Sequence, residues 1–170
     1  KADVERVTSF LRYIKKSDVQ RLINKLKYKG EKEIGVFLGK YAAAELVDKD
    51  VFGSVDVIVP VPLHESKYRK RGYNQSRCIA DGMAEIMGIP VDDGNLYRAV
   101  ENPTQTRKST YERWENTKGI FELTDGSLFD GKHILLVDDV LTTGSTLIAC
   151  VEAIREKSNA KISVFTLASA

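Results

Sequence analysis

Two adjacent carboxylates and a short run of hydroxyl side chains follow one another in this sequence, at Asp138, Asp139 and then residues 142–146. Unpaired backbone N–H groups at the start of a helix, together with hydroxyl donors, favour a bound phosphate. Carboxylates would repel that phosphate unless they faced a hydroxylated, metal-bound part of the same ligand, and Mg²⁺ prefers such oxygen ligands. Taken separately, the paired carboxylates are typical of a solvated strand end, and the run of hydroxyl residues is typical of an ordinary helix start. Together, the two features predict a site for a phosphorylated sugar with Mg²⁺.

We call residues 140–146 the phosphate loop. Its glycine is free to take a positive φ, and its hydroxyl residues can donate to phosphate oxygens while the following helix begins. The predicted substrate-binding residues of this loop are Val140, Leu141, Thr142, Thr143, Gly144, Ser145 and Thr146.

A second group of candidate residues begins at Pro60. Two prolines separated by one residue predict a rigid turn, and several positively charged side chains follow it. Arginine grips phosphate oxygens in a bidentate way, which makes Arg71 and Arg69 better candidates for holding a pyrophosphate than the lysines. A run of charges is also typical of a solvated surface, and His64 fits a ligand contact and an ordinary loop position equally well. The predicted pyrophosphate-binding residues are Pro60, Val61, Pro62, Leu63, His64, Lys67, Arg69 and Arg71.

A long polar segment lies between Val100 and Phe121. Long polar segments in compact α/β domains are commonly lids or binding loops, and a mobile surface connection is the alternative. Exclusion of water from a ligand site at the edge of the sheet would give a closing loop a function there. We therefore predict a lid over about residues 101–118, with Arg107 and Lys108 as substrate-binding residues.

The elements that must position these residues alternate between strands and helices. Residues 134–137 are four branched apolar side chains without alternation, which predicts a strand buried on both faces, as in parallel sheets. Other strands are predicted at 55–61, 96–100, 119–123 and 161–167, and helices at 18–29, 31–49, 74–88 and 147–157. Ser17 or Asp18 can cap the first of these helices, and Asn74 can cap the third. This alternation implies an α/β fold with a mostly parallel central sheet flanked by helices and ligands at the carboxyl ends of the strands. We expect one domain over residues 1–170, with an amino-terminal helical part at 1–50 and a core at 51–170.

The composition restricts the classes of function. Lys and Arg number 26 against 24 for Asp and Glu, a net charge of +2 that argues against a dedicated nucleic-acid binder. No apolar run approaches the length of a membrane span and no basic-then-apolar leader opens the chain, so a cytoplasmic location is the expectation. Cys78 and Cys150 lack metal-binding spacing and are expected to be thiols of the core.

The motif at residues 134–146 resembles the phosphoribosyl pyrophosphate (PRPP) signature of type I phosphoribosyltransferases. Further strings narrow the resemblance, at residues 26–30, 60–64 and 71–75, at Gln105, and at residues 112–113 and 116–121. Together they make the chain similar to the ComF family of competence-associated phosphoribosyltransferase-like proteins over nearly its whole length. Members of that family usually carry an amino-terminal zinc ribbon of cysteines, and this sequence contains no such cluster.

The resemblance implies transfer of a 5-phosphoribosyl group from PRPP to a nitrogen nucleophile, with Mg²⁺ as cofactor and pyrophosphate as leaving group. The catalytic residues would be Asp138, Asp139 and Arg71. The two aspartates would hold the ribose hydroxyls and, through water, Mg²⁺, and the phosphate loop would hold the 5-phosphate. The expected partners are PRPP, pyrophosphate, an unidentified nitrogen acceptor, competence or DNA-processing proteins, and a second copy of the chain in a homodimer.

Two other classes of function stay open. One is a PRPP-binding regulator that retains the site without turnover, and the other is a module that handles single-stranded DNA with Lys67–Arg71 and the lid cations. Only Tyr68 and Tyr73 are near that basic run to stack on bases, which weakens the DNA hypothesis. A dinucleotide-binding protein is disfavoured, because no Gly-x-Gly-x-x-Gly motif follows a predicted strand.

Overall fold

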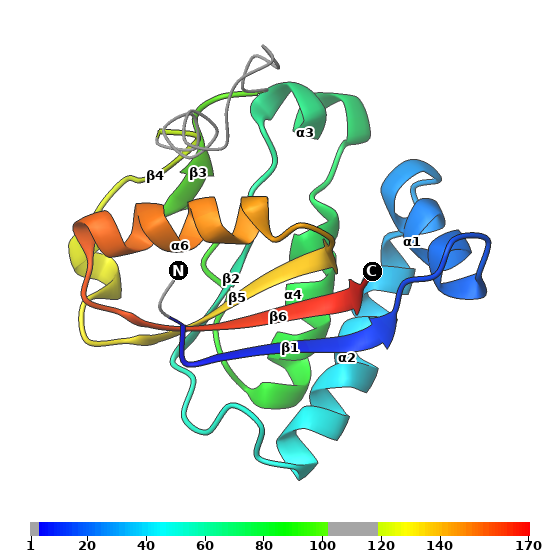
Figure 1. Ribbon diagram of the computed structural model, residues 1–170, viewed down its shortest axis with the longest axis horizontal. Helices are drawn as coiled ribbons and strands as arrows, with labels where there is room; N and C mark the ends of the chain where they lie inside the picture. The colour runs from blue at the N-terminus through cyan, green and yellow to red at the C-terminus, as the bar shows by residue number, and fades with distance from the viewer. Residues whose placement is uncertain (1–3, 102–118) are drawn as a thin grey trace.

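A computed structural model of the chain describes residues 4–101 and 119–170. Its central sheet has four strands in the order β1-β6-β5-β2, and every neighbouring pair is parallel. The carboxyl ends of these strands therefore lie along one edge of the sheet (Figure 1). The strands are β1 (Arg6–Arg12), β2 (Val57–Pro60), β5 (His133–Leu141) and β6 (Lys161–Ser169).

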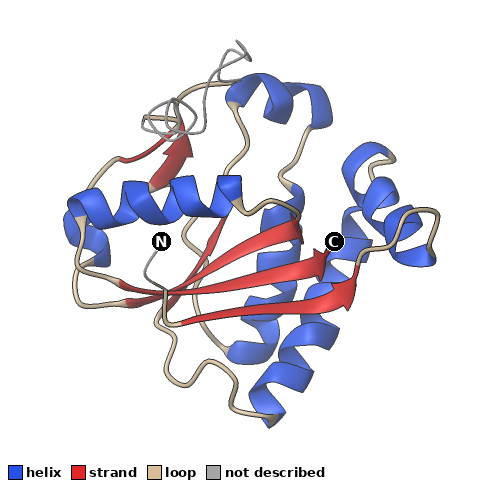
Figure 2. Ribbon diagram, in the orientation of Figure 1, coloured by secondary structure: helices blue, strands red, loops and turns tan. Residues whose placement is uncertain are grey.

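Helices cover both faces of the sheet (Figures 1 and 2). One face packs against α2 (Lys32–Asp48) and α4 (Gln75–Met87), and α1 (Asp18–Tyr28) closes the end of that layer. The other face packs against α6 (Ser145–Lys157). The remaining described elements are α3 (Glu65–Arg71), β3 (Leu96–Arg98), β4 (Phe121–Leu123) and the 3₁₀ helix η1 (Gly126–Phe129).

Strand β5 connects the two hydrophobic cores, because its successive side chains point to opposite faces of the sheet. Leu135 and Val137 join the core under α2 and α4, whereas Ile134 and Leu136 join the core under α6. All four side chains are fully buried. The prediction of a strand buried on both faces in a mostly parallel sheet is thus confirmed.

The helix starts predicted from capping residues are also confirmed. The Ser17 hydroxyl accepts a hydrogen bond from the Gln20 N–H at 3.3 Å at the start of α1, and the Asn74 side chain accepts one from the Ser76 N–H at 2.9 Å at the start of α4. Gly88 ends α4 with a φ of 67°, a conformation that favours glycine. These local signals succeed because each one satisfies a backbone group that the helix itself leaves unpaired.

Three elements differ from the sequence-based expectations. Residues 6–12 form strand β1 rather than part of the expected helical segment 1–50, and this edge strand gains its hydrogen bonds from β6, more than 150 residues away. Residues 65–71, for which the sequence predicted no helix, form α3 between a His64 N-cap and Gly72 at φ 82°. The expected strands at 96–100 and 119–123 form the separate antiparallel pair β3 and β4 rather than joining the parallel sheet. The reason in the first and third cases is a long-range pairing that local patterns do not encode.

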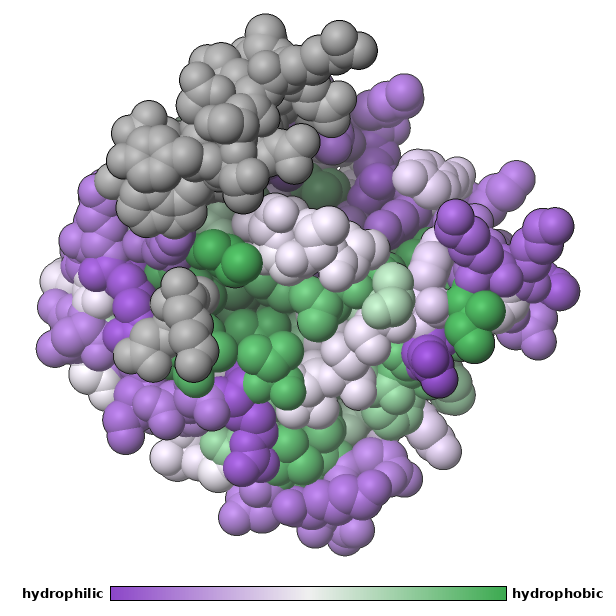
Figure 3. Space-filling model, viewed as in Figure 1, coloured by the Kyte–Doolittle hydropathy of each residue, from purple (hydrophilic) through white to green (hydrophobic). Residues whose placement is uncertain are grey.

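Figure 3 shows hydrophobic residues gathered over the middle of one face of the molecule, with hydrophilic residues around the rim. Val7 of β1 and Ile148 of α6 are 49% and 39% exposed. Among the residues that the structure describes, no helix combines the length and apolar character that crossing a membrane requires.

Helices α2 and α4 approach each other at two glycines. A Cβ added to Gly39 would lie 2.2 Å from the Ile79 carbonyl oxygen, and one added to Gly82 would lie 2.1 Å from the Val36 carbonyl oxygen. Real Cβ atoms do not come this close to backbone, so the two helices can pack at this distance only with glycine at both positions. This packing supports the end of α4 that carries site residues.

We predict that Gly39→Ala destabilises the protein by about 1 to 3 kcal/mol, because the added methyl group forces the two helix backbones apart. The higher helix propensity of alanine opposes this loss by up to about 1 kcal/mol. Urea unfolding followed by circular dichroism measures the change. Ala44→Val, at an exposed position of the same helix, is the control, and an unchanged or increased stability of Gly39→Ala contradicts the packing argument.

Candidate active site

The carboxylates of Asp138 and Asp139 lie at the carboxyl end of β5 and are almost completely buried, with 9% and 4% of each residue exposed. Asp138 Oδ1 accepts hydrogen bonds from the Ser76 hydroxyl at 3.0 Å and from the Asp139 N–H at 2.9 Å. Asp139 Oδ1 accepts one from the Val140 N–H at 2.7 Å. Burial, together with the neighbouring Asp139 carboxylate, raises the pKa of Asp138 to about 7, even though its hydrogen bonds and Lys27 act to lower it. A bound cation would favour the ionised form of Asp138.

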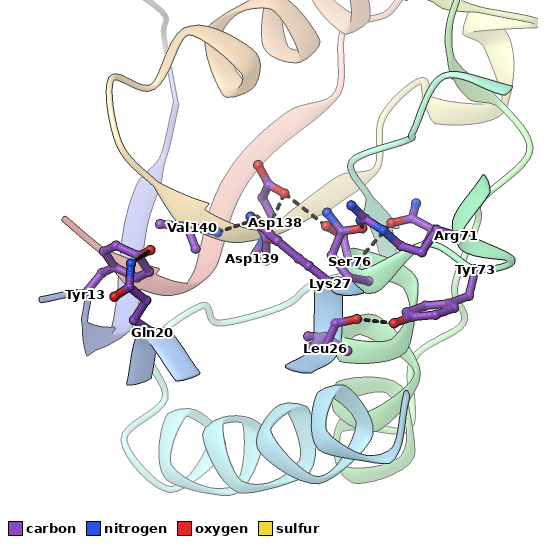
Figure 4. A network of polar contacts seen from close by, with 12 residues as sticks. Tyr13, Gln20, Leu26, Lys27, Arg71, Tyr73, Ser76, Asp138, Asp139 and Val140 are labelled. Atoms are coloured by element: carbon purple, nitrogen blue, oxygen red, sulfur yellow. Dashed lines mark hydrogen bonds and ion pairs between the residues drawn. The ribbon is translucent and has the colours of Figure 1, made fainter. Parts of the chain in front are cut away.

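Lys27 provides the opposite charge. Its ammonium nitrogen lies 2.9 Å from Asp139 Oδ2, and the side chain itself is 23% exposed (Figure 4). The contact is an ion pair without hydrogen-bond alignment, because no donor within the described residues is aligned with that buried oxygen. Asp139 Oδ2 is therefore available to a ligand that displaces the lysine.

Tyr73 positions Lys27 by fixing the end of α1. The Tyr73 hydroxyl donates a hydrogen bond to the Leu26 carbonyl oxygen, and the fully buried Leu26 side chain anchors the helix in the core (Figure 4). Burial raises the pKa of Tyr73, so the hydroxyl keeps the proton that it donates. The residue next to Leu26 is thereby held over the carboxylates.

Arg71, at the end of α3, lies on the same side of the molecule. Its guanidinium donates to the Gln75 side chain and lies 5.6 Å from the centroid of the Tyr28 ring. Neither partner is a carboxylate, so the positive charge of Arg71 is not neutralised by these contacts. The guanidinium remains able to bind an anion.

Asp138, Asp139, Lys27 and Arg71 line one cavity of about 370 Å³ at the carboxyl edge of the sheet. The structure brings together ten of the predicted residues there: Val61, Pro62, Leu63, Lys67, Arg71, Asp138, Asp139, Val140, Thr142 and Thr146. The carboxylates, Lys67 and Arg71 of α3 and the start of α6 thus meet at a single cavity.

The phosphate loop forms a smaller hollow of about 30 Å³ beside this cavity, lined by all seven of its residues. Gly144 takes a φ of 78° directly before α6, and the Ile148 N–H donates to its carbonyl oxygen at 2.9 Å. The hydroxyls of Thr143 and Ser145 are 2.9 Å apart. A Cβ at Gly144 would meet only ordinary contacts, so it is the positive φ that requires glycine.

Three of the predicted site residues that the structure describes lie away from these two cavities. The His64 ring caps α3, with Nδ1 3.3 Å from the Ser66 N–H and 3.0 Å from the Ser66 hydroxyl. Arg69 pairs with Glu65 on an exposed side of α3, and Pro60 is buried within β2. None of these three residues lines the cavities just described. The predicted lid, with Arg107 and Lys108, lies outside the described residues except for position 101.

Several cavity residues were missed by the sequence-based site prediction. They are Tyr13, Lys27, Tyr28, Gln75 and Arg98, together with Ser76 behind Asp138. Lys27 and Tyr28 belong to a string that resembles the ComF family, which was the only signal available for them. Arg98 stacks on Phe121, at 5.4 Å from its ring centroid, and so depends on the pairing of β3 with β4.

The two carboxylates fit a divalent cation that also binds water and ligand oxygens. They supply hard oxygen donors, and Asp139 Oδ2 is buried without an aligned donor. No group of three or more possible ligand side chains occurs in the described part of the chain. The donor set therefore suits Mg²⁺ held jointly with a substrate, rather than a cation held by protein alone. Both cysteines are buried and their pKa values are raised by burial, which disfavours a reactive thiolate.

Comparison with known proteins identifies the family. Residues 73–170, more than half of the chain, match the model of the phosphoribosyl transferase domain. The chain belongs to the phosphoribosyl transferase family.

Its relatives confirm the ComF resemblance. The chain is 34% identical over 116 residues to competence protein F of Haemophilus influenzae, which covers 68% of this chain and 51% of that protein. It is 31% identical over 149 residues to the DNA utilization protein YhgH of Salmonella typhi, covering 86% of this chain and 65% of that protein. The chain thus spans half to two thirds of the length of these relatives.

Solved structures show the same fold. Glutamine PRPP amidotransferase from B. subtilis superposes with a TM-score of 0.52 at 23% identity, over 78% of this chain and 25% of that chain. A hypoxanthine phosphoribosyltransferase from Staphylococcus aureus superposes with a TM-score of 0.50 at 19% identity, over 81% of this chain and 64% of that chain. At these identities the likeness establishes the type I phosphoribosyltransferase fold.

We predict that Lys27→Met destabilises the protein by roughly 1 to 3 kcal/mol, because it leaves the buried Asp139 carboxylate without its opposite charge. Lys25→Met is the matched control, since Lys25 on the same helix pairs with Glu31 at 3.7 Å and is 52% exposed. Chemical unfolding measures both variants. The double variant Lys27→Met with Asp139→Asn should recover most of the loss, and the absence of recovery would contradict the ion-pair explanation.

Proposed function

We propose that this protein is a phosphoribosyltransferase that binds PRPP with Mg²⁺ and transfers the 5-phosphoribosyl group to a nitrogen nucleophile. The observation that carries the proposal is the single cavity of about 370 Å³ where buried paired carboxylates, an arginine with no carboxylate partner in its described contacts and the start of α6 meet. Each of these three groups suits a different part of PRPP. The names of the relatives add a link to competence and DNA utilization, and we propose a cytoplasmic enzyme acting with such proteins.

The phosphate loop would bind the 5-phosphate. Its backbone N–H groups and hydroxyls lie at the amino end of α6, where the helix dipole also favours an anion. Asp138 and Asp139 would accept hydrogen bonds from the ribose hydroxyls and hold Mg²⁺, which supplies charge to the departing pyrophosphate when bound. Arg71 and Lys67 would bind that pyrophosphate against the Val61–Leu63 turn.

In the proposed reaction, the acceptor nitrogen forms a bond to C1 of the ribose with its lone pair. The bond between C1 and the pyrophosphate oxygen breaks, and its electron pair leaves with pyrophosphate. The acceptor loses a proton where its nitrogen carried one. Catalysis of this kind rests on positioning and on charges placed in advance around the developing sugar cation and leaving group.

We predict that PRPP with Mg²⁺ raises the melting temperature of the protein, since a ligand that binds only the folded state stabilises it. Differential scanning fluorimetry with millimolar PRPP measures the shift. The double variant Asp138→Asn with Asp139→Asn should fold and show little or no shift. The control variant Asp48→Asn, at the end of α2, should respond as the wild type does. No shift for the wild-type protein would argue strongly against PRPP as its ligand.

The second prediction for this function concerns turnover. With Mg²⁺, PRPP and a productive acceptor, pyrophosphate release should depend on the acceptor, and Asp139→Asn should slow it about a hundredfold, corresponding to about 3 kcal/mol of lost electrostatic stabilisation. Gly144→Val should also reduce release, because valine is strained at the φ of 78° observed there. Ammonia, free purine and pyrimidine bases, and other amines are the acceptors to screen. PRPP binding without pyrophosphate release on any of them would favour a PRPP-binding regulator.

A further inference from the structure

A second cavity, of about 380 Å³, adjoins the first on the side of α1 and α3. Its lining residues are Lys27, Tyr28, Gly30, Lys67, Lys70, Arg71 and Tyr73. The wall common to both cavities consists of Lys27, Tyr28, Lys67 and Arg71. A molecule in the second cavity would therefore lie next to whatever occupies the first.

The second cavity has an excess of positive charge. Four of its lining residues are basic, and none of the lining residues that the structure describes is a carboxylate. Lys27 is neutralised by Asp139, whereas Lys67 and Lys70 form no ion pair and Arg71 contacts only Gln75 and Tyr28 among the described residues. In the free protein, three positive charges thus have no carboxylate partner among the described residues. Lys67 and Arg71 also line the first cavity, where they are the proposed pyrophosphate ligands, so Lys70 is the cation that belongs to the second cavity alone. A second anion would bind at Lys70, beside the two shared cations.

Two acidic residues on the neighbouring elements are paired with basic residues that do not line the second cavity. Glu31, which follows α1, is paired with Lys25 at 3.7 Å. Glu65, in the first turn of α3, is paired with Arg69. Each of these carboxylates therefore already has a basic partner outside the lining of the second cavity.

One wall of the second cavity is aromatic. The Tyr28 residue is 72% exposed, and the Arg71 guanidinium lies 5.6 Å from its ring centroid. An exposed ring beside cations suits a planar group that carries a negative charge, because stacking and charge then act on one ligand. Tyr73 does not offer a second platform, since it is only 6% exposed and its hydroxyl is held by Leu26.

We propose that the second cavity is an anion subsite that receives the acceptor, and that this acceptor combines a planar ring with a group of two negative charges, such as a phosphate. The proposal rests on the proposed phosphoribosyl transfer, because the wall common to the two cavities would bring this acceptor beside bound PRPP. The proposal specifies the chemical class of the acceptor, which the motif residues do not identify.

Phenyl phosphate is the probe for this subsite, since it combines one ring with one phosphate. Isothermal titration of phenyl phosphate into protein saturated with Mg²⁺ and PRPP should show one further site. Inorganic phosphate, which lacks the ring, should bind about tenfold more weakly, and phenol, which lacks the charge, should not bind measurably.

The variant Lys70→Ala tests the second cavity without altering the lining of the first, because Lys70 lines only the second one. This variant should weaken phenyl phosphate binding several-fold while leaving the PRPP-dependent melting shift unchanged. Tyr28→Ala should abolish the advantage of phenyl phosphate over inorganic phosphate. Lys132→Ala, at an exposed lysine preceding β5, is the control and should change neither measurement.

Three results would overturn the subsite. The first is competition between phenyl phosphate and PRPP for one site, which would assign the second cavity to the leaving pyrophosphate. The second is absence of phenyl phosphate binding to protein that does bind PRPP, which would rule out the subsite but not the proposed function. Binding of a deoxythymidine oligonucleotide without binding of phenyl phosphate would identify a polymer surface instead. If PRPP itself fails to bind, the proposed function fails, and a phenyl phosphate site that is sensitive to Lys70→Ala in the free protein would still support an anion site there.

Discussion

Burial of two neighbouring carboxylates at the end of β5 is the constraint on which the rest of the site depends. Two charges removed from water at adjacent positions are costly unless donors and an opposite charge surround them. The chain supplies a hydroxyl from α4, two backbone N–H groups of β5 itself and the ammonium group of Lys27 from α1. Elements distant in the sequence must therefore lie around β5 in one arrangement, and that arrangement is the same one that forms the cavity.

The connection between α1 and α4 follows from this requirement. Tyr73 precedes α4 and binds the backbone of Leu26, so the residue that neutralises Asp139 is held by the same segment that leads to Ser76. The glycine contacts between α2 and α4 set the spacing of that layer. Packing and electrostatics are thus linked: a shift of α4 would displace both the hydroxyl behind Asp138 and the lysine opposite Asp139.

Local signals in the sequence predicted the parts of the molecule that local chemistry determines. The uninterrupted apolar run before Asp138, the capping residues Ser17 and Asn74, and the glycine at 144 each satisfy a requirement within a few residues. Strand β1 and the pair of β3 with β4 could not be predicted in the same way, because their hydrogen-bond partners are distant in the sequence. Lys27 was missed as a site residue for the same reason, since a lysine near the end of an amphipathic helix is ordinarily solvated.

The position of α1 relative to the matched domain has an evolutionary consequence. The residues that match the phosphoribosyl transferase domain begin at position 73, whereas Lys27 and Tyr28, which line both larger cavities, precede it. Asp138, Asp139 and the phosphate loop, the proposed ligands of the ribose and its 5-phosphate, thus lie within the matched domain, whereas part of the cavity wall beside them comes from α1. A substitution of Tyr28 would change the lining of both larger cavities without touching the phosphate loop. Under the proposed function, the acceptor side of the site could therefore vary during evolution while the side that binds the ribose 5-phosphate is retained.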